Sequence, residues 1–184
     1  MDAGLIARRY ATVLHDFAAD HGKLDEVYAD AVVVRQALAE QPQAKKFFDS
    51  PLRKLSEKKA LVEAVFASRV TPETLQFLTF LVDKERIGYV SSILLVFEML
   101  YKTERHICTA RLTTAKELTA QQKERLTGLV SDKLKASGKE VEAIDATFRV
   151  NPAIIGGLIL EVDGCQVDGS IRSKLKAVER QLTV

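Results

Sequence analysis

The sequence predicts a mainly α fold, in which an N-terminal six-helix bundle is followed by a small α/β domain of mixed strands and helices. Two observations support this prediction. Through residues 1–105, apolar residues recur with the period of amphipathic helices. After His106 the pattern changes to the alternation that is typical of strands, with further helices between them. We therefore expect two domains, at residues 1–105 and 106–184.

The first two expected helices are separated by a glycine. Apolar residues line one face of each helix: Ile6, Tyr10, Val13, Leu14 and Phe17 in the first, and Leu24, Val27, Ala31, Val34 and Leu38 in the second. Gly22 suits the conformation that ends many helices, so the first helix should end near His21. The second should end near Gln41, because Pro42 disfavours α geometry in the residue before it.

Four more helices are expected before residue 106. The third covers residues 44–48, and the fourth ends at Phe66 after a start that the hydroxyl of Ser56 can cap. Thr71 is expected to cap the fifth helix, which has a proline in its first position. The apolar stripe of this helix consists of Leu75, Leu78, Leu81 and Val82, and it is widened by Phe77 and Phe80. The sixth covers residues 89–105. Short connections between six helices predict a compact bundle.

The second domain begins with strand patterns that enclose a helix. Residues 107–112 and 143–150 alternate along the chain as strands do. Between them, Thr119 and Gln122 have the spacing of a capping box, and Gly138 is expected to end the helix that follows. The residues of this helix that we expect to face inward are Leu126, Leu129, Val130 and Leu134.

The segment 151–175 has the most distinctive pattern of the chain, NPAIIGGLILEVDGCQVDGSIRSKL. Gly156-Gly157 opens an apolar strand, where a missing β-carbon allows a bulge or a close approach of backbone. Asp163-Gly164 suits a type I′ turn, so residues 165–168 should pair back as a hairpin. Asp168 or Ser170 can then cap a terminal helix. Its expected apolar face is Ile171, Leu175, Val178 and Leu182.

The charge balance argues against a nucleic-acid partner. The chain has 27 basic and 25 acidic residues, which lacks the basic excess that drives nucleic-acid binding. One cluster, Arg53, Lys54, Lys58 and Lys59, is interrupted by an acidic residue and indicates a solvated helix face. The alternative is a helical RNA-binding module of the antitermination-factor kind, in which this cluster would contact phosphates.

Composition also limits where the chain resides. With 47% hydrophobic and 28% charged residues it has the composition of a soluble globular protein. No apolar run approaches the roughly 20 residues needed to cross a bilayer, so any membrane contact is expected to be indirect. The N-terminus lacks the apolar core of a secretory signal, which predicts retention in the compartment of synthesis. Cys108 and Cys165 are accordingly expected to be reduced.

No residue pattern indicates catalysis, a cofactor or a metal site. His15 and His21 lie six apart on one expected helix, whereas metal ligands prefer a spacing of three or four. Gly156-Gly157 lacks the lysine that follows in a phosphate loop, and Asp168-Gly169-Ser170 lacks the flanking glycines of a nucleophile elbow. We therefore expect no enzyme. An enzyme in the second domain would require a pocket with converging polar groups.

Three segments together resemble the delta subunit of F-type ATP synthases, the family that includes the mitochondrial oligomycin-sensitivity-conferring protein. They are ARRYATVLHDFA at 7–18, FLTFLVDKERIGYV at 77–90 and, most specifically, the segment 151–175. The resemblance implies a non-catalytic stator subunit of a proton-translocating ATP synthase, which holds the catalytic head against the torque of the rotor. It also implies a peripheral position on the cytoplasmic face of a bacterial energy-transducing inner membrane, with the stromal or matrix face of an organelle membrane as the alternative.

The resemblance assigns one partner to each domain. Residues 1–105 would bind N-terminal segments of the alpha subunits of the head, and residues 106–184 would bind the b-type peripheral stalk. An amphipathic helix of the head would occupy a groove between the first and fifth helices. The candidate residues for this groove are Tyr10, Ala11, Leu14, Phe77 and Leu81. The candidates for the stalk are basic residues of the terminal helix: Arg172, Lys176 and Arg180.

Overall fold

A computed structural model describes residues 3–50 and 52–182 of the chain, with the side chain of Leu182 outside what is described. The chain divides into two compact units, Met1–Tyr101 and Lys102–Val184. The division falls inside the last turn of a helix that ends at Glu104, whereas the sequence pattern placed the boundary after residue 105. The mainly helical fold with a small mixed sheet in its C-terminal part agrees with the prediction.

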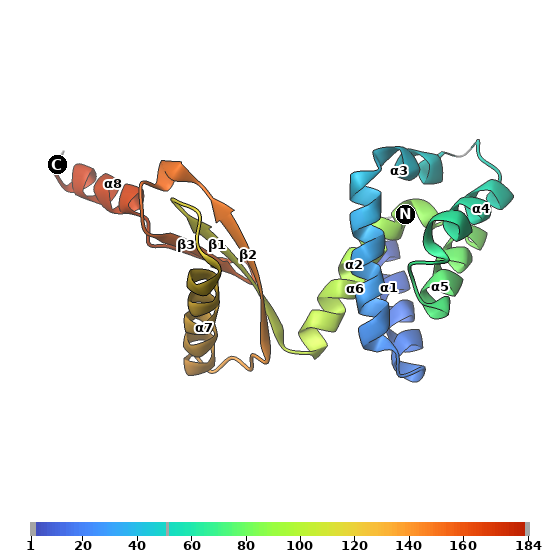
Figure 1. Cartoon of the computed structure of the whole chain (residues 1–184), viewed down its shortest axis with the longest axis horizontal. Helices are drawn as coiled ribbons and strands as arrows, with labels where there is room; N and C mark the ends of the chain where they lie inside the picture. Colours follow the sequence, from blue (N-terminus) through green and yellow to red (C-terminus); the bar gives the residue numbers. More distant parts are fainter. Residues whose placement is uncertain (1–2, 51, 183–184) are drawn as a thin grey trace. The chain divides into compact units, whose positions relative to one another are not determined.

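Unit 1 is helical throughout its described part (Figure 1). Its elements are α1 (Ala3–Asp20), α2 (Leu24–Glu40), α3 (Pro42–Asp49), α4 (Leu55–Phe66), α5 (Pro72–Asp83), the short 3-10 helix η1 (Ile87–Tyr89) and α6 (Val90–Glu104). The predicted six-helix bundle therefore gains η1, which begins just before the expected break at Gly88. Side chains from α1, α2, α4, α5 and α6 form the core: Leu14, Val27, Val34, Val62, Leu78, Leu81, Ile93, Leu94 and Phe97 are at most 1% exposed.

Two helix starts in unit 1 were predicted from hydroxyl caps, and they differ in outcome. Thr71 caps α5 as expected, since its side chain accepts a hydrogen bond from the amide of Thr74. Ser56 does not cap α4. The extended residue before α4 is Lys54, so the helix begins at Leu55 and Ser56 already lies within its first turn. A hydroxyl inside the first turn cannot occupy the capping position.

A buried carboxylate joins α2 to the start of α5. Asp30 Oδ2 accepts hydrogen bonds from the backbone amide of Thr71 at 2.7 Å, from Thr71 Oγ1 at 2.7 Å and from Thr74 Oγ1 at 2.8 Å. Asp30 is 8% exposed and Thr74 is 1% exposed. Because three donors converge on one oxygen, this contact determines where α5 begins relative to α2.

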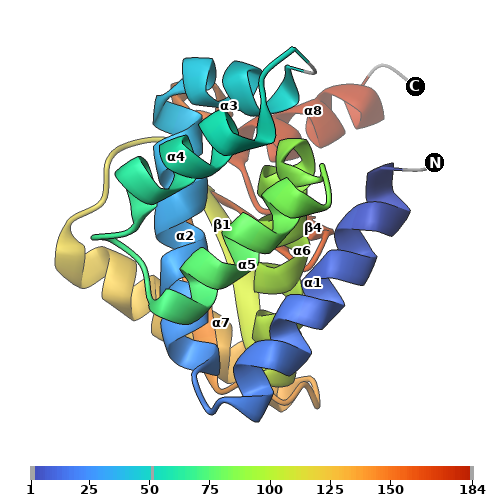
Figure 2. The same ribbon diagram turned by 90° about the vertical axis from the view of Figure 1, so that its right-hand side faces the viewer.

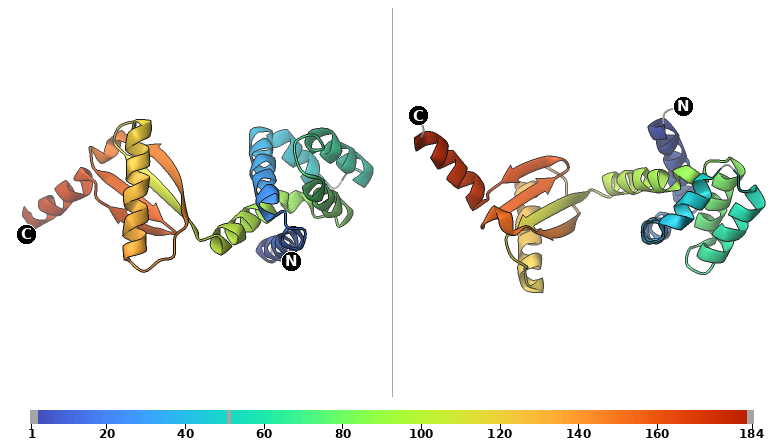
Figure 3. Two further views of the ribbon diagram at one scale, coloured as in Figure 1. Left: turned by 60° about the horizontal axis from the view of Figure 1, so that its bottom comes forward. Right: turned by 90° about the horizontal axis from the view of Figure 1, so that it is seen from above.

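Unit 2 contains a four-stranded sheet with a helix across one face. Its elements are β1 (Ile107–Thr114), α7 (Ala120–Ala136), β2 (Ala143–Val150), the 3-10 helix η2 (Pro152–Ile154), β3 (Leu158–Val162), β4 (Cys165–Asp168) and α8 (Ile171–Leu182). The strand order is β2-β1-β3-β4, with β1 and β2 parallel and the other pairs antiparallel. Parallel neighbours need a crossover connection, and α7 provides it (Figure 3, left).

The core of unit 2 lies between the sheet and α7. Its buried residues are Cys108, Ala110, Leu112, Val130, Val141 and Val162. Leu126 and Leu134 pack against this core as predicted, but Leu129 is 51% exposed, so its predicted inward position is wrong. Residues four apart stay on nearly the same side of a helix, which places Leu126, Val130 and Leu134 together. Leu129 lies about 100° around the helix axis from Val130.

The glycines of the segment 151–175 have the roles that the pattern predicted. Asp163 and Gly164 have φ values of 47° and 83°, as a type I′ turn requires, and β3 and β4 form the expected hairpin. Gly157 has a φ of 80°, and a β-carbon there would overlap the carbonyl oxygen of Gly169. The backbone at the start of β3 thus lies directly against the residues that precede α8.

Of the two predicted caps of the terminal helix, Ser170 occupies the capping position, and Asp168 supports it through hydrogen bonds to Ser170 and Ser173. Asp168 Oδ1 accepts a hydrogen bond from the amide of Ser170 at 2.8 Å, and Asp168 Oδ2 accepts one from the hydroxyl of Ser173 at 2.6 Å. The Ser170 hydroxyl in turn accepts a hydrogen bond from the amide of Ser173 at 3.2 Å. The hydrogen bonds that Asp168 accepts from Ser173 and Ser170 favour its ionised form and lower its pKa below the ordinary value.

Candidate functional site

An open apolar groove lies between α1 and α5 of unit 1. Its volume is about 210 Å³, and the residues that line it are Val13, Phe17, Gln76, Phe77 and Phe80. We call it the α1–α5 groove. The two helices lie side by side (Figure 2), and the rings of Tyr10 and Phe80 meet across them with centroids 6.2 Å apart. Gln76 is the one polar residue of this lining.

The spacing of residues along the two helices produces this groove. Tyr10, Val13 and Phe17 follow one another at intervals of three and four on α1, so they share one face of the helix. On α5, Phe77 and Phe80 are three apart, with ring centroids 6.5 Å from each other. Val13 is 48% exposed and Phe80 is 38% exposed. The groove therefore keeps apolar surface in contact with water.

The structure divides the predicted head-interface residues between core and surface. Ala11, Leu14 and Leu81 are completely buried, and Phe77 is 5% exposed. Tyr10 is half-buried at the groove. Four residues that line the groove were not among the candidates, namely the polar Gln76 and the apolar Val13, Phe17 and Phe80. The three apolar ones belong to the same apolar stripes in the sequence, but the helical period alone does not separate the rim of a groove from the core behind it.

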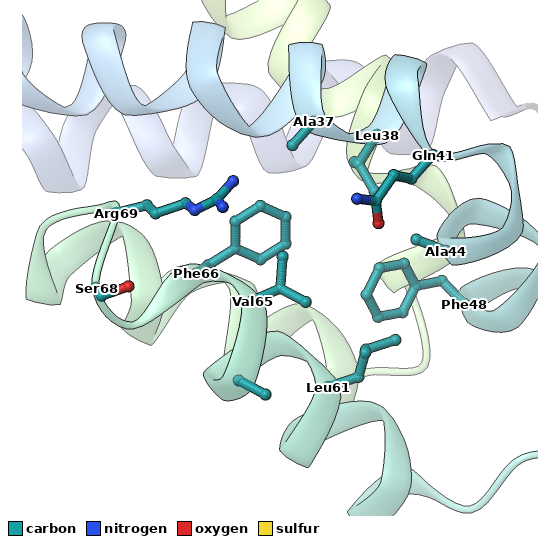
Figure 4. A pocket seen from close by; sticks show the side chains of 11 residues that line it. Ala37, Leu38, Gln41, Ala44, Phe48, Leu61, Val65, Phe66, Ser68 and Arg69 are labelled. Atoms are coloured by element: carbon teal, nitrogen blue, oxygen red, sulfur yellow. The ribbon is translucent and has the colours of Figure 1, made fainter.

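A second cavity in unit 1 is formed by the end of α2 together with α3 and α4 (Figure 4). Its volume is about 270 Å³. Phe48 and Phe66 point into it from α3 and α4, and Arg69 and Gln41 approach it with polar ends. The remaining lining residues are Ala37, Leu38, Ala44, Leu61, Ala64, Val65 and Ser68. No catalytic or ligand-binding pattern from the sequence falls in this cavity.

The basic cluster near the start of α4 does not form one exposed face. Lys59 pairs with Asp83 of α5, with the charged atoms 2.6 Å apart. Lys58 is buried, and its ammonium donates a hydrogen bond to the carbonyl oxygen of Phe48 at 2.7 Å. Of the four, Arg53 and Lys54 are exposed and Lys59 is partly exposed. The arrangement does not favour an RNA-binding surface, which needs several basic side chains on one face.

The terminal helix α8 carries the exposed apolar surface of unit 2. Ile171, Leu175 and Val178 form one stripe and are 43%, 56% and 51% exposed. In Figures 1 and 3, α8 extends away from the sheet of its own unit. The stripe therefore does not cover the sheet. The predicted stalk residues Arg172, Lys176 and Arg180 are all exposed. At 100° per residue, Arg172 lies beside the stripe, whereas Lys176 and Arg180 lie toward the opposite face of α8.

Groups that could perform chemistry are dispersed in the described part of the chain. No group of three or more His, Cys, Asp or Glu side chains there could hold a metal ion. Cys108 and Cys165 are free thiols, and burial raises the pKa of Cys108. His15 approaches Asp16, and His21 approaches the carbonyl oxygen of Phe17. None of the helices described is long and apolar enough to span a bilayer.

Comparisons with known proteins match almost the whole chain. The family model described as "ATP synthase delta (OSCP) subunit" matches residues 6–182. The ATP synthase subunit delta of Desulforamulus reducens is 34% identical over 97% of this chain and 96% of that protein. The chloroplastic subunit delta of Emiliania huxleyi is 33% identical over 96% of each.

The fold has a counterpart among solved structures. A chain in the cryo-EM structure of the Toxoplasma gondii mitochondrial ATP synthase hexamer superposes with a TM-score of 0.71. The superposition covers 97% of both chains at 22% sequence identity. At that identity the likeness is one of fold.

Proposed function

Since the chain belongs to the ATP synthase delta (OSCP) subunit family and is a non-catalytic stator subunit of the rotary ATP synthase, we propose that each unit binds one neighbour in the complex. Unit 1 binds N-terminal segments of the alpha subunits in the catalytic head, and unit 2 binds the b-type peripheral stalk. The chain thereby holds the head against the torque of the rotor. We place it on the cytoplasmic face of a bacterial energy-transducing inner membrane, in contact with the membrane only through the complex.

The α1–α5 groove carries the first half of this proposal. An amphipathic helix docks by placing apolar anchors, three or four residues apart, between two helices of its partner. The methyl groups of Val13 and the ring of Phe80 are exposed, and such anchors would remove them from contact with water. Complete burial of one large apolar side chain contributes about 1.5 to 3 kcal/mol. Tyr10 can keep its hydroxyl in water while its ring covers the edge of the interface.

The groove suits a helix better than a small metabolite. Small-molecule sites enclose their ligand and orient it with a few converging polar groups. The α1–α5 groove is shallow, and its lining of Val13, Phe17, Gln76, Phe77 and Phe80 has a single polar member. Specific interfaces of about 1,200 to 2,000 Å² reach nanomolar affinity, or about 12 kcal/mol. A groove of this kind contributes the central apolar contact, and residues around its rim complete the area.

The exposed stripe of α8 supports the second half. The helix α8 is capped at its start by Ser170, yet leaves Ile171, Leu175 and Val178 in water. It therefore presents a preformed surface for another amphipathic helix. The basic residues of α8 around this stripe favour a stalk end that is acidic. Exposed ion pairs contribute at most about 1 kcal/mol each, so Arg172, Lys176 and Arg180 act on orientation and association rate more than on affinity.

The head contact is tested with one variant and a matched control. Phe80→Asp places a charge in the α1–α5 groove, whereas Val32→Asp places one on α2, at a residue that is 41% exposed against 38% for Phe80. Binding of a synthetic alpha N-terminal peptide to the full chain is measured by calorimetry. We expect Phe80→Asp to weaken binding by about a hundredfold, and Val32→Asp by less than about threefold. Equal effects of the two variants would contradict the proposal.

The stalk contact is tested in the assembled enzyme. Membranes that contain the ATP synthase without this subunit are reconstituted with the chain, and ATP-driven proton pumping is recorded together with capture of the b subunit. Leu175→Asp on α8 is expected to abolish both, while Val150→Asp, at a residue 53% exposed at the end of β2, leaves them intact. Normal pumping with Leu175→Asp would show that α8 does not bind the stalk.

A further inference from the structure

A third cavity of unit 1 lies where the end of α3, the start of α4 and the η1 region meet. We call it the α3–α4–η1 cavity. Its volume is about 530 Å³. Four of its lining side chains are cationic and two are acidic: Arg53, Lys54, Lys58 and Arg86, and Asp49 and Glu85. From this arrangement we propose that the cavity binds an oxyanion of the phosphate class that carries at least two negative charges, such as a diphosphate group.

Lys58 provides the strongest reason for an anionic ligand. This lysine is 9% exposed, and its ammonium donates one hydrogen bond, to the neutral carbonyl oxygen of Phe48 at 2.7 Å. Among the residues that the structure describes, no carboxylate forms an ion pair with it. A buried charge without a counter-charge is costly, and an ammonium has three N–H groups to donate. Two of these donors remain for a ligand in the cavity.

The start of α4 adds a second source of positive potential. The residue before the helix is Lys54, and its side chain makes no capping hydrogen bond to the backbone amides of the first turn. Leu55, the first residue of α4, lines the cavity. Uncapped amides and the helix dipole favour an anion at a helix start. Here they act beside a buried ammonium and the side chains of two arginines.

The arginines are held loosely and can turn toward a ligand. Arg86 donates a hydrogen bond to the carbonyl oxygen of Glu85 at 3.3 Å. Arg53 lies over the ring of Phe47 and approaches Glu57 to 3.6 Å, with both side chains about half exposed. A guanidinium matches the geometry of phosphate oxygens with paired N–H donors. Phosphate oxygens would therefore compete well for these side chains.

Two carboxylates of the lining, Asp49 and Glu85, bear on how much negative charge the ligand must carry. Asp49 lies close to η1, since a β-carbon on Gly88 would lie 2.6 Å from its Oδ1 atom. With Asp49 and Glu85 the lining has an excess of two positive charges, which a singly charged anion leaves partly uncompensated. The cavity volume of about 530 Å³ also leaves room for a diphosphate. The charge therefore favours a diphosphate over chloride or acetate.

The proposal is tested on the full chain by NMR titration of labelled protein with pyrophosphate at constant ionic strength, with chloride as the reference. We expect saturable shifts of the amides of Leu55, Lys58 and Gly88. Lys54→Ala combined with Arg86→Ala is expected to weaken binding by about tenfold or more, because two charge-assisted contacts are lost. Lys59→Ala is the matched control, since Lys59 pairs with Asp83 outside the cavity lining and should leave binding unchanged.

Further ligands separate the sources of such a group and the outcomes that overturn the proposal. If ADP binds at least as tightly as pyrophosphate, the ligand is a nucleotide; if pyrophosphate binds more tightly, it is a free diphosphate. The proposal would be overturned if neither ADP nor pyrophosphate caused saturable shifts. It would also be overturned if hexaglutamate bound more tightly than both, which would indicate an acidic peptide as the ligand. Lys54 and Arg86 lie outside the α1–α5 groove and α8. The tests of the head and stalk contacts are therefore independent of this result.

Discussion

Replacing Asp30 with alanine should strongly destabilise unit 1. The carboxylate of Asp30 receives three hydrogen bonds from Thr71 and Thr74, at 2.7, 2.7 and 2.8 Å, and these connect α2 to the start of α5. Thr74 is 1% exposed, so water cannot readily replace the lost acceptor. Because α5 forms one wall of the α1–α5 groove, the same change should also disturb the surface that we propose for the head.

The magnitude follows from these contacts. A hydrogen bond to a charged group contributes about 1.5 to 3 kcal/mol, and bonds that share one acceptor are not additive. The hydroxyls of Thr71 and Thr74 lie 3.1 Å apart and can partly satisfy each other, which reduces the loss. We therefore expect Asp30→Ala to lower the free energy of unfolding of unit 1 by about 3 to 5 kcal/mol. Domains typically have only about 5 to 15 kcal/mol in total.

Tyrosine fluorescence during urea unfolding measures this loss in unit 1 alone. The chain has no tryptophan, and its four tyrosines, Tyr10, Tyr28, Tyr89 and Tyr101, all belong to unit 1. Asp20→Ala is the control, because Asp20 is exposed at the end of α1 and its loss should change stability by less than about 0.5 kcal/mol. A loss below about 1 kcal/mol for Asp30→Ala would refute the reasoning, since it would mean that the three hydrogen bonds add little beyond solvation.

Three further tests, one with a single substitution and two with matched pairs, address separate parts of the structure. Lys23 lies 3.0 Å from Glu73, and its hydrogen bond lowers the pKa of that carboxyl below its ordinary value. Wild type should therefore be more stable than Glu73→Gln at neutral pH, and the difference in urea midpoint should disappear as the pH falls through the lowered pKa; a difference independent of pH would contradict the pairing. Gly157→Ala should destabilise unit 2 by at least about 2 kcal/mol, because Gly157 has a positive φ and an added β-carbon would overlap Gly169. Gly128→Ala should instead stabilise unit 2 by about 0.5 to 1 kcal/mol, because Gly128 lies on α7 with open space around it. Circular dichroism during thermal unfolding compares the two variants. Val130→Ala should lower the free energy of unfolding of unit 2 by about 2 kcal/mol, and Leu129→Ala by less than about 0.5 kcal/mol. Hydrogen exchange of the β1 amides measures both losses, and a reversed order would place Leu129 in the core.

Local patterns were sufficient for the elements whose signals are short in range. The capping box at Thr119 and Gln122 begins α7, and Asp163-Gly164 forms the turn between β3 and β4. In each case the residues that carry the signal also make the local hydrogen bonds or adopt the backbone angles that define the element. The one failed cap, at Ser56, lies where Lys54 is the extended residue before the helix. A choice between start positions two residues apart depends on how the helix packs.

The candidate sites were predicted to the level of helices but not of residues. The stripes on the first and fifth helices correctly indicated apolar faces, and the α1–α5 groove lies between them. Leu14 and Leu81 nevertheless belong to the core, and Val13 and Phe80 lie at the surface. Lys58 shows the same limit, because the sequence placed it on a solvated face, whereas the structure buries it beside a cavity.

The amino-acid sequence by itself determined the order and type of the elements, the hairpin, most of the helix ends and the family, since these depend on residues near one another in the chain. Only the tertiary structure decided which side of each apolar stripe remains in water, which charges are paired and where cavities lie. Lys59 meets Asp83, and Asp30 meets Thr71, across long separations in sequence. Such contacts depend on how whole helices pack, and packing is determined by the combined shape of many side chains, which no single helical period encodes.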